Sequence, residues 1–177
     1  MKTIFSERKS PRAKWHDYNG AEYFITICTK RQAHYFGEII NGEIILTDIG
    51  LHLKLQIENI QNHYPFVEIL LYTIMPNHIH FIIAIDNNKT PCRDKTNTLT
   101  DDTKNEHMKD ISNKQGWLSV CIGSIKSAVT KYANESKIPF AWQGRFHDRI
   151  IRNRNEMNRI AEYINSNPIK WESYRYH

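Results

Sequence analysis

Cysteine is scarce in this sequence and forms no spaced framework. The three cysteines are Cys28, Cys92 and Cys121. Their number is odd and no two of them form a CxxC pair, so a disulfide scaffold and a zinc ribbon are both disfavoured. A chain with this cysteine usage suits a reducing compartment, and we expect a cytoplasmic protein.

Long hydrophobic runs and nucleotide-binding loops are also missing. No run of about 18 apolar residues occurs, so no membrane-spanning helix is expected. Residues 1–9 lack the apolar segment of a secretory signal. The chain contains no GxxxxGK[ST] motif, and a reaction driven by nucleotide hydrolysis through a phosphate loop is therefore not expected.

The composition supports one folded domain with an excess of positive charge. The chain has 177 residues, 40% hydrophobic and 11% aromatic, with a formal net charge of +5 and a pI of about 9.1. We expect a single domain over 1–177 and an anionic partner. Residues 1–20 indicate a basic arm, for which a solvated tail is an equal alternative. The polar stretch 87–113 indicates a mobile insertion, in preference to a compact functional loop.

The spacing of apolar residues predicts a mixture of strands and helices. The dipeptide Asn41–Gly42 lies between two pairs of isoleucines and indicates a hairpin turn. Asn155 is expected to cap the last helix, and the Asn167–Pro168 pair to end it. The expected elements are strand 23–29, hairpin 38–46, helix 49–60, strand 67–73, strand 75–85, helix 118–132, strand 146–151 and helix 156–166. This order predicts an α+β sandwich, with a mostly antiparallel sheet and helices packed on it.

Two histidines lie two residues apart on a predicted strand. His78 and His80 therefore project from the same face, while Ile79 and Phe81 point into apolar packing. Paired imidazoles on a rigid strand are a good start to a divalent metal site. The alternative is that both are polar residues on a half-exposed face, since an HxH spacing alone is weak evidence.

A tyrosine and an asparagine share one face of the last predicted helix. Tyr163 and Asn167 are four residues apart, so they are neighbours if the helix persists that far. The phenol could act as a nucleophile, and the carboxamide oxygen could bind Mg²⁺ or Mn²⁺. The alternative is an ordinary amphipathic helix with a buried tyrosine and an asparagine that ends it.

Six segments carry a family resemblance when they are taken in order: YFITICTK at 23–30, IMPNHIHF at 74–81, GSIKSAV at 123–129, WQGRFHD at 142–148, IRN at 151–153 and EYINSNP at 162–168. They cover most of the chain apart from the polar insertion and the termini. Together they resemble the single-tyrosine HUH transposases, in the version found in REP-associated tyrosine transposases. The resemblance implies a ferredoxin-like α+β fold.

The resemblance also implies a site. His78 and His80 would bind one Mg²⁺ or Mn²⁺ ion, and Tyr163 would be the nucleophile. Asn167 stands where related insertion-sequence enzymes carry a glutamine ligand. Because asparagine is one methylene shorter, His147 and Asp148 are alternatives for the third ligand.

The implied reaction is the cutting and rejoining of single-stranded DNA, at or near hairpins, through a 5′-phosphotyrosine intermediate. A homodimer and a monomer are both compatible with the resemblance. Basic and aromatic side chains in the second half of the chain are expected to contact DNA, although solvated surface or core positions remain the alternative for about half of such residues. The predicted DNA-binding residues are Lys126, Lys131, Trp142, Arg145, Arg149, Arg152, Arg154 and Arg159.

Two other functions compete with this prediction. A non-catalytic nucleic-acid-binding module on the same scaffold would keep the basic face and need neither the histidines nor Tyr163. A metal-dependent hydrolase would use the HxH pair with water as nucleophile, but large barrel hydrolases need about 250 residues. Formation of a covalent DNA adduct in the presence of Mn²⁺ separates these functions from a transposase.

Overall fold

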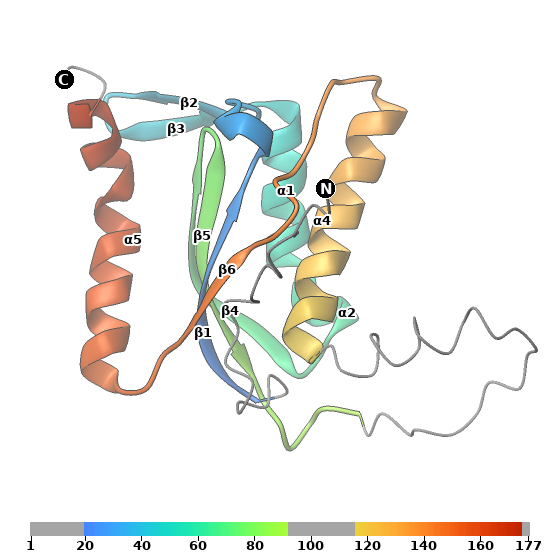
Figure 1. The fold of residues 1–177 in the computed structure, drawn as a ribbon, viewed down its shortest axis with the longest axis vertical. Coiled ribbons are helices and arrows are strands. Elements are labelled where there is room, and N and C mark those ends of the chain that lie inside the picture. Colours follow the sequence, from blue (N-terminus) through green and yellow to red (C-terminus); the bar gives the residue numbers. More distant parts are fainter. Residues whose placement is uncertain (1–19, 92–115, 175–177) are drawn as a thin grey trace, which may run out of the picture.

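The computed structural model describes residues 20–91 and 116–174, with the side chains of 172–174 left aside (Figure 1). The predicted arm 1–20, apart from Gly20, and the predicted insertion 87–113 beyond Pro91 lie outside the described residues. The elements are β1 (Ala21–Cys28), the 3-10 helix η1 (Lys30–Gln32), β2 (Gly37–Ile40), β3 (Glu43–Leu46), α1 (Asp48–Glu58), α2 (Ile60–His63), β4 (Val67–Met75), β5 (His78–Ile85), α4 (Trp117–Glu135), β6 (His147–Ile150) and α5 (Arg154–Tyr174).

Four strands form the central sheet in the order β4-β5-β1-β6, and every neighbouring pair is antiparallel. Along the chain, β1 and α1 are followed by β4, β5, α4 and β6. This is the βαββαβ order of a ferredoxin-like sandwich. The predicted α+β fold is confirmed.

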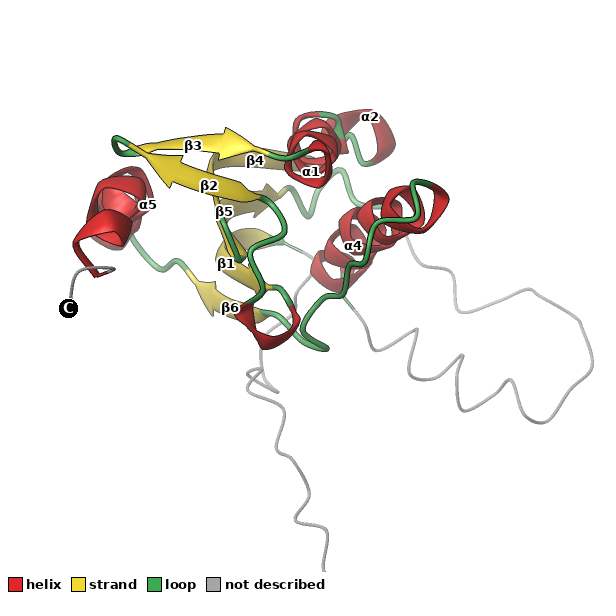
Figure 2. Cartoon of the chain, turned by 90° about the horizontal axis from the view of Figure 1, so that it is seen from above, coloured by secondary structure: helices red, strands yellow, loops and turns green. Residues whose placement is uncertain are grey.

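The two faces of the sheet carry different helices (Figure 2). The side chains of β1 alternate, so that Tyr23, Ile25 and Ile27 are fully buried in the core beneath α1 and α4. The opposite face packs a smaller cluster that includes Ile82 of β5 and Ile164 of α5. Any side chain that alternates with the main core therefore faces α5.

The hairpin β2–β3 turns at the predicted dipeptide. Asn41 and Gly42 have φ angles of 53° and 77°, the left-handed conformation that two-residue hairpin turns require. The tip of the hairpin reaches α5, because a Cβ built on Gly42 would lie 3.5 Å from Cγ1 of Ile169. The C-terminal part of α5 therefore lies close to this hairpin (Figure 1).

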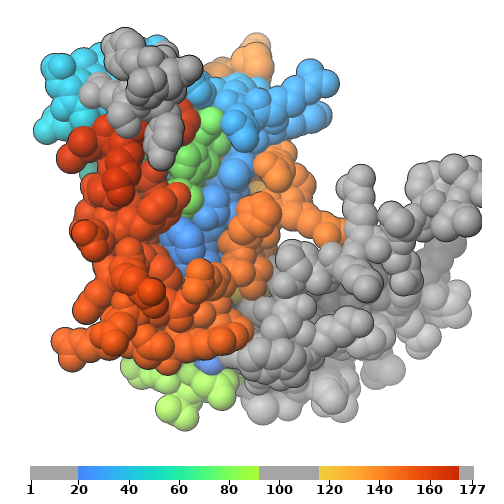
Figure 3. Space-filling model, turned by 60° about the vertical axis from the view of Figure 1, so that its left-hand side comes forward, coloured from blue at the N-terminus to red at the C-terminus, as the bar shows by residue number. Residues whose placement is uncertain are grey.

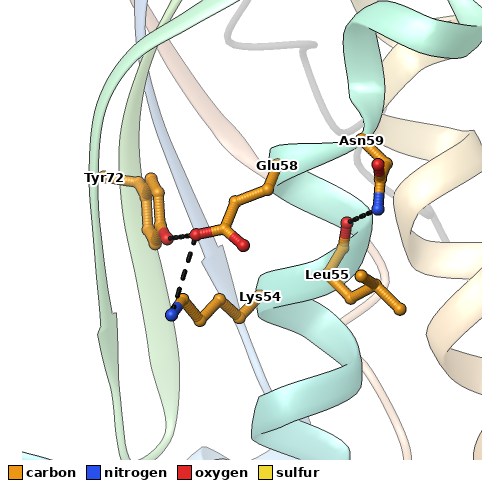
Figure 4. A network of polar contacts seen from close by, with 5 residues as sticks. All are labelled: Lys54, Leu55, Glu58, Asn59 and Tyr72. Carbon is orange, nitrogen blue, oxygen red and sulfur yellow. Dashed lines mark hydrogen bonds and ion pairs between the residues drawn. The ribbon is translucent and has the colours of Figure 1, made fainter.

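A polar network ties α1 to β4 on the face opposite α5 (Figure 4). The hydroxyl of Tyr72 donates to Oε1 of Glu58 at 2.6 Å, and Nζ of Lys54 lies 3.7 Å from the same oxygen. Burial, and then the Glu58 carboxylate, raise the pKa of Tyr72. Nearby, Nδ2 of Asn59 donates to the carbonyl of Leu55 at 2.9 Å where α1 ends.

The predicted bounds of the last helix were wrong at both ends. The side chain of Asn153, not Asn155, accepts the N–H of Glu156 at 2.9 Å and caps α5. The helix then runs through Pro168 to Tyr174. Proline removes one helical hydrogen bond, but the packing of this part of α5 on the β2–β3 hairpin and on the start of β5 outweighs that loss. Asn167 is consequently helical, as its pairing with Tyr163 requires.

A second difference concerns the turn before the histidines. Strand β4 extends to Met75, which pairs with His78, so Pro76 and Asn77 form a two-residue turn rather than the start of a strand. Among the described residues, no helix combines the length and apolar character needed to cross a membrane.

Candidate functional site

Three predicted site residues meet between β5 and α5. The hydroxyl of Tyr163 lies 3.3 Å from Nε2 of His80. The ring centroids of His78 and His80 are 4.6 Å apart, and those of His80 and Tyr163 are 5.2 Å apart. A phenol from the end of the chain and two imidazoles from its middle thus form one cluster.

Strand alternation explains why the histidines face α5. Ile79 and Phe81 are fully buried in the main core, so His78 and His80 take the other side of the sheet. In the neighbouring strand, Thr26 is the register partner of His80. Helix α5 lies on this side of the sheet (Figure 2), and the hydroxyl of its Tyr163 reaches Nε2 of His80.

Hydrogen bonds fix the orientation of both imidazoles. Nδ1 of His78 donates to Oδ1 of Asn77 at 2.6 Å, because an amide oxygen only accepts. The lone pair of His78 is therefore on Nε2. Nδ1 of His80 is bonded to Oγ1 of Thr26 at 2.8 Å, which leaves its Nε2 toward Tyr163. Such partners orient histidines in metal sites.

The histidines are also neutral. Burial lowers the pKa of His78 to about 4. Burial, and then the neighbouring His78, lower the pKa of His80 to about 3. At neutral pH each ring retains a nitrogen lone pair, which is the form that binds a metal ion.

Asn77 is a residue of the candidate site that the sequence interpretation missed. It is 6% exposed, and its carbonyl accepts both the N–H and the hydroxyl of Thr29 at 2.9 Å. These bonds fix the turn, so that the Asn77 side chain can hold His78. Its place directly before the HxH spacing was the available signal, and Thr26, a polar residue between Ile25 and Ile27, was a weaker one.

Tyr163 is accessible to a large substrate. It is 45% exposed, which contradicts the alternative of a buried structural tyrosine. The ring of Phe24 lies edge-on to it, with centroids 6.0 Å apart and an interplanar angle of 89°. The ring is therefore held by packing on one side, and the hydroxyl lies beside His80.

Asn167 lies between the two contact points of α5. Tyr163 contacts His80 at one turn, and Trp171 lies beside His78 two turns later, with ring centroids 5.7 Å apart. Asn167 is midway on the same stripe, four residues from each. Its Nδ2 is buried and has no hydrogen-bond partner among the described residues. Rotation of the amide would present the oxygen at this position instead.

This donor set fits a divalent metal ion. Two neutral imidazoles and one unsatisfied carboxamide are the nitrogen and oxygen ligands that such ions accept. Within 20–91 and 116–174, no cluster of three His, Cys, Asp or Glu side chains is placed to hold a metal. A cluster of three protein ligands from these ranges would therefore need another residue type, and the asparagine Asn167 is a candidate.

The two alternative third ligands, His147 and Asp148, lie on opposite faces of the sheet. Asp148 pairs with Ile25, so it projects toward α1 and α4, away from the histidines, and that alternative was wrong. His147 pairs with Thr26 and shares the correct face. It is two strands away from His80, a separation of about 10 Å.

The predicted DNA-binding residues do not form one continuous surface. Arg149 and Arg159 line a hollow with Tyr163. Arg152 and Arg154 line a second hollow at the start of α5, with a volume of about 370 Å³. In Figure 3, parts of β1 and β5 are visible between α5 and the orange strand β6. Arg149 and Arg159 thus share a hollow with Tyr163 itself, whereas Arg152 and Arg154 line a separate one.

The remaining predicted residues lie elsewhere. Nζ of Lys126 donates to the carbonyl of Gln143 at 2.8 Å, and Nε1 of Trp142 donates to the carbonyl of Lys126 at 3.1 Å. This pair holds the segment before β6 against α4, on the other face of the sheet. Lys131 lies on the same helix beside a hollow, and Arg145 is exposed.

Comparisons with known proteins agree with the fold. No family model matches the chain. A solved structure of a REP-associated tyrosine transposase bound to a REP hairpin superposes with a TM-score of 0.52 at 19% identity, over 91% of this chain and 74% of that one. The chain thus shares the fold of this REP-associated tyrosine transposase, and the resemblance predicted from the motifs is confirmed at the level of the fold.

A protein of similar sequence shows the family to which the chain belongs. A Haemophilus influenzae protein, described as uncharacterised, is 37% identical over 171 residues, which are 93% of this chain and 90% of that protein. The chain belongs to the same family as this protein.

Proposed function

We propose that the protein is a transposase-type enzyme that cuts and rejoins single-stranded DNA through Tyr163, with Mg²⁺ or Mn²⁺ as cofactor. The observation that carries the proposal is the hydroxyl of the exposed residue Tyr163, 3.3 Å from a neutral imidazole that is paired with a second one. The shared fold with a transposase bound to a REP hairpin supports DNA with hairpin structure as the partner.

The proposed reaction is a transesterification at a phosphodiester of DNA. The phenolic oxygen would attack phosphorus, the bond to the 3′ oxygen would break, and the strand would leave with a 3′-hydroxyl. The proton lost by the phenol balances the proton gained by the leaving oxygen. One phosphodiester replaces another, so attack by a 3′-hydroxyl can reverse the step without a nucleotide cofactor. The product on the protein is a 5′-phosphotyrosine.

Activation of the phenol is the difficult part, because its ordinary pKa is near 10. His78, His80 and Asn167 would hold the metal ion, whose positive charge favours the phenolate and polarises the phosphate. Asn77 and Thr26 keep the imidazoles in the orientation that presents Nε2. Phe24 and the packing of α5 restrict the tyrosine ring to a position beside them.

A labelled oligonucleotide tests the proposal directly. Single strands carrying a hairpin and a 3′ label are incubated with the protein and Mn²⁺, and the products are separated under denaturing conditions. A labelled band at the mass of protein plus DNA is expected, and a chelator should prevent it. The absence of an adduct across a panel of hairpin-bearing strands would favour a non-catalytic binding module.

Asn77→Ala is expected to weaken Mn²⁺ binding by about 10- to 100-fold, the usual effect of losing the hydrogen bond that orients a histidine ligand. The carbonyl of Asn77 still accepts from Thr29, so the turn should remain. Calorimetric titration with Mn²⁺ measures the change, and Asn62→Ala on the exposed surface of α2 is the matched control. Equal affinities of the two variants would show that Asn77 does not orient a metal ligand.

Arg152→Glu is expected to reduce binding to single-stranded DNA and its dependence on salt. Each lost phosphate contact should lower the slope of log K against log salt by about 0.7. Fluorescence anisotropy across a salt series, in a Tyr163→Phe background, gives the slope. Lys54→Glu on α1, beneath the other face of the sheet, is the control. An unchanged slope for Arg152→Glu would assign this arginine to solvent.

A further inference from the structure

A hollow of about 300 Å³ adjoins the candidate nucleophile on the side away from Asn167. It is lined by Phe24, Arg149, Glu156, Arg159, Ile160 and Tyr163. Ligand pockets in proteins span about 300 to 1,000 Å³, so this hollow is at the small end of that range. Its size suits a single nucleotide unit.

The apolar part of the hollow is the ring of Phe24 and the side chain of Ile160. Phe24 stacks on His80 with centroids 5.3 Å apart at an interplanar angle of 27°, and it lies edge-on to Tyr163. The same ring therefore belongs both to the hollow and to the cluster around the hydroxyl. Aromatic side chains of this kind are platforms on which unpaired bases stack.

The polar rim of the hollow carries positive charge in excess. The guanidinium of Arg149 is 2.6 Å from Oε1 of Glu156, whose other oxygen accepts the N–H of Arg152 at 3.0 Å. That backbone hydrogen bond, and then Arg149, hold the pKa of the Glu156 carboxyl below its usual range. One carboxylate thus offsets one of two guanidinium groups. Arg159 supplies the remaining positive charge.

The ion pair also orients Arg149 without using all of its hydrogen-bond donors. The Glu156 side chain is 9% exposed, whereas that of Arg149 is 68% exposed. Glu156 is further fixed by its place in the cap of α5, where its N–H donates to Asn153. A guanidinium has five N–H groups, so Arg149 keeps donors for a ligand phosphate.

The hollow adjoins the nucleophile on the side of the preceding helical turn, because Tyr163 and Arg159 both line it. Arg159 precedes Tyr163 by one helical turn, a rise of about 6 Å. Asn167 follows Tyr163 by the same interval, on the side of His78. A strand whose scissile phosphate is at the Tyr163 hydroxyl would therefore place a neighbouring nucleotide in the hollow.

We infer that this hollow is a subsite for one of the two nucleotides that flank the scissile phosphate, with its base against Phe24 and its phosphate between Arg149 and Arg159. The inference rests on the proposed function. It assigns Phe24 a role in recognition of DNA, and it separates Arg149 and Arg159 from the other basic residues as contacts next to the reaction.

Abasic and neutral-linkage oligonucleotides test the subsite. A strand that forms the adduct is remade without a base at each position near the cut, or with a methylphosphonate at each linkage beside the scissile one. In the wild type, loss of the base at one flanking position is expected to weaken binding and slow adduct formation by about 10-fold, the usual contribution of a stacked base. The same modification should have much less effect in Phe24→Leu. The methylphosphonate should likewise have much less effect in Arg159→Gln.

Binding of the modified strands is measured with the Tyr163→Phe protein, and with the other two substitutions made in that background, without added metal. This measurement is independent of catalysis. Thermal unfolding shows whether Phe24→Leu is folded; Arg159 is exposed on α5, so its variant provides the test in either case. If adducts form but each DNA modification acts equally in the wild type and in both variants, the subsite is refuted and the proposed function stands. If no strand forms an adduct, the proposed function fails. If a DNA modification weakens binding less in the Phe24 or Arg159 variant than in the Tyr163→Phe protein, that result would then still support a nucleotide site in the hollow.

Discussion

Tyr163→Phe is expected to abolish the covalent protein–DNA adduct and strand cleavage while folding and DNA binding stay nearly unchanged. The substitution removes only the hydroxyl, which lies 3.3 Å from His80, and keeps the ring that packs edge-on to Phe24. No other described side chain presents a hydroxyl bonded to His80 except Thr26, whose oxygen is on the Nδ1 side. Denaturing electrophoresis measures the adduct, and anisotropy measures binding.

A matched control separates the loss of a nucleophile from the loss of any phenolic hydroxyl. Tyr72→Phe also removes a hydroxyl, one that donates to Glu58 on the opposite side of the sheet (Figure 4). This variant should still form the adduct. Phenylalanine at both Tyr174 and Tyr176, the other tyrosines at the C-terminal end of the sequence, should leave it intact as well. An adduct that persists in Tyr163→Phe would assign the nucleophile to a different residue.

Local patterns in the sequence were sufficient for most of the fold. The hairpin at Asn41–Gly42 was predictable because only a few residues adopt positive φ at two successive positions. The placement of His78 and His80 on one face followed from strand periodicity, because Ile79 and Phe81 had to enter the core. Both predictions depend on interactions between residues near in sequence.

The end of α5 was not predictable by the same reasoning. The Asn167–Pro168 pair disfavours helix locally, yet α5 continues to Tyr174. The forces that outweigh the local preference come from distant segments. Ile169 lies at the tip of the β2–β3 hairpin, and Trp171 contacts His34 and His78. A sequence pattern does not contain these contacts.

The site shows the same division between local and long-range information. The contact between His80 and Tyr163 joins residues 83 positions apart, and only the family resemblance suggested it. Asp148 was a reasonable ligand by residue type, but the register of β6 on β1 turns it to the other face. Asn77 and Thr26 were missed because their roles depend on hydrogen bonds to the histidines, which spacing does not reveal.

The dependence on metal gives the other large expected effect. His80→Ala is expected to lower the affinity for Mn²⁺ by more than about 100-fold, beyond the range for a residue that only orients a ligand, and to abolish the adduct. The side chain offers Nε2 at the point where Tyr163 and the paired imidazole of His78 converge. His78→Ala should also lose metal binding and activity, and excess Mn²⁺ should restore part of the activity if His80 and Asn167 still bind the ion. Calorimetric titration measures affinity without reference to catalysis.

His52→Ala is the control for these histidine variants. His52 stacks on Tyr132 with ring centroids 4.2 Å apart, in the helical layer on the other side of the sheet, so its loss should leave Mn²⁺ affinity unchanged. Thermal unfolding should show that His78→Ala and His80→Ala remain folded, because replacing a neutral imidazole, half-buried in His78 and buried in His80, with alanine leaves the apolar side of β5 intact. Unchanged Mn²⁺ affinity in both folded variants would mean that the two imidazoles do not hold the ion. Activation of Tyr163 would then have to come from something other than a metal ion held by the two histidines and the unsatisfied amide of Asn167.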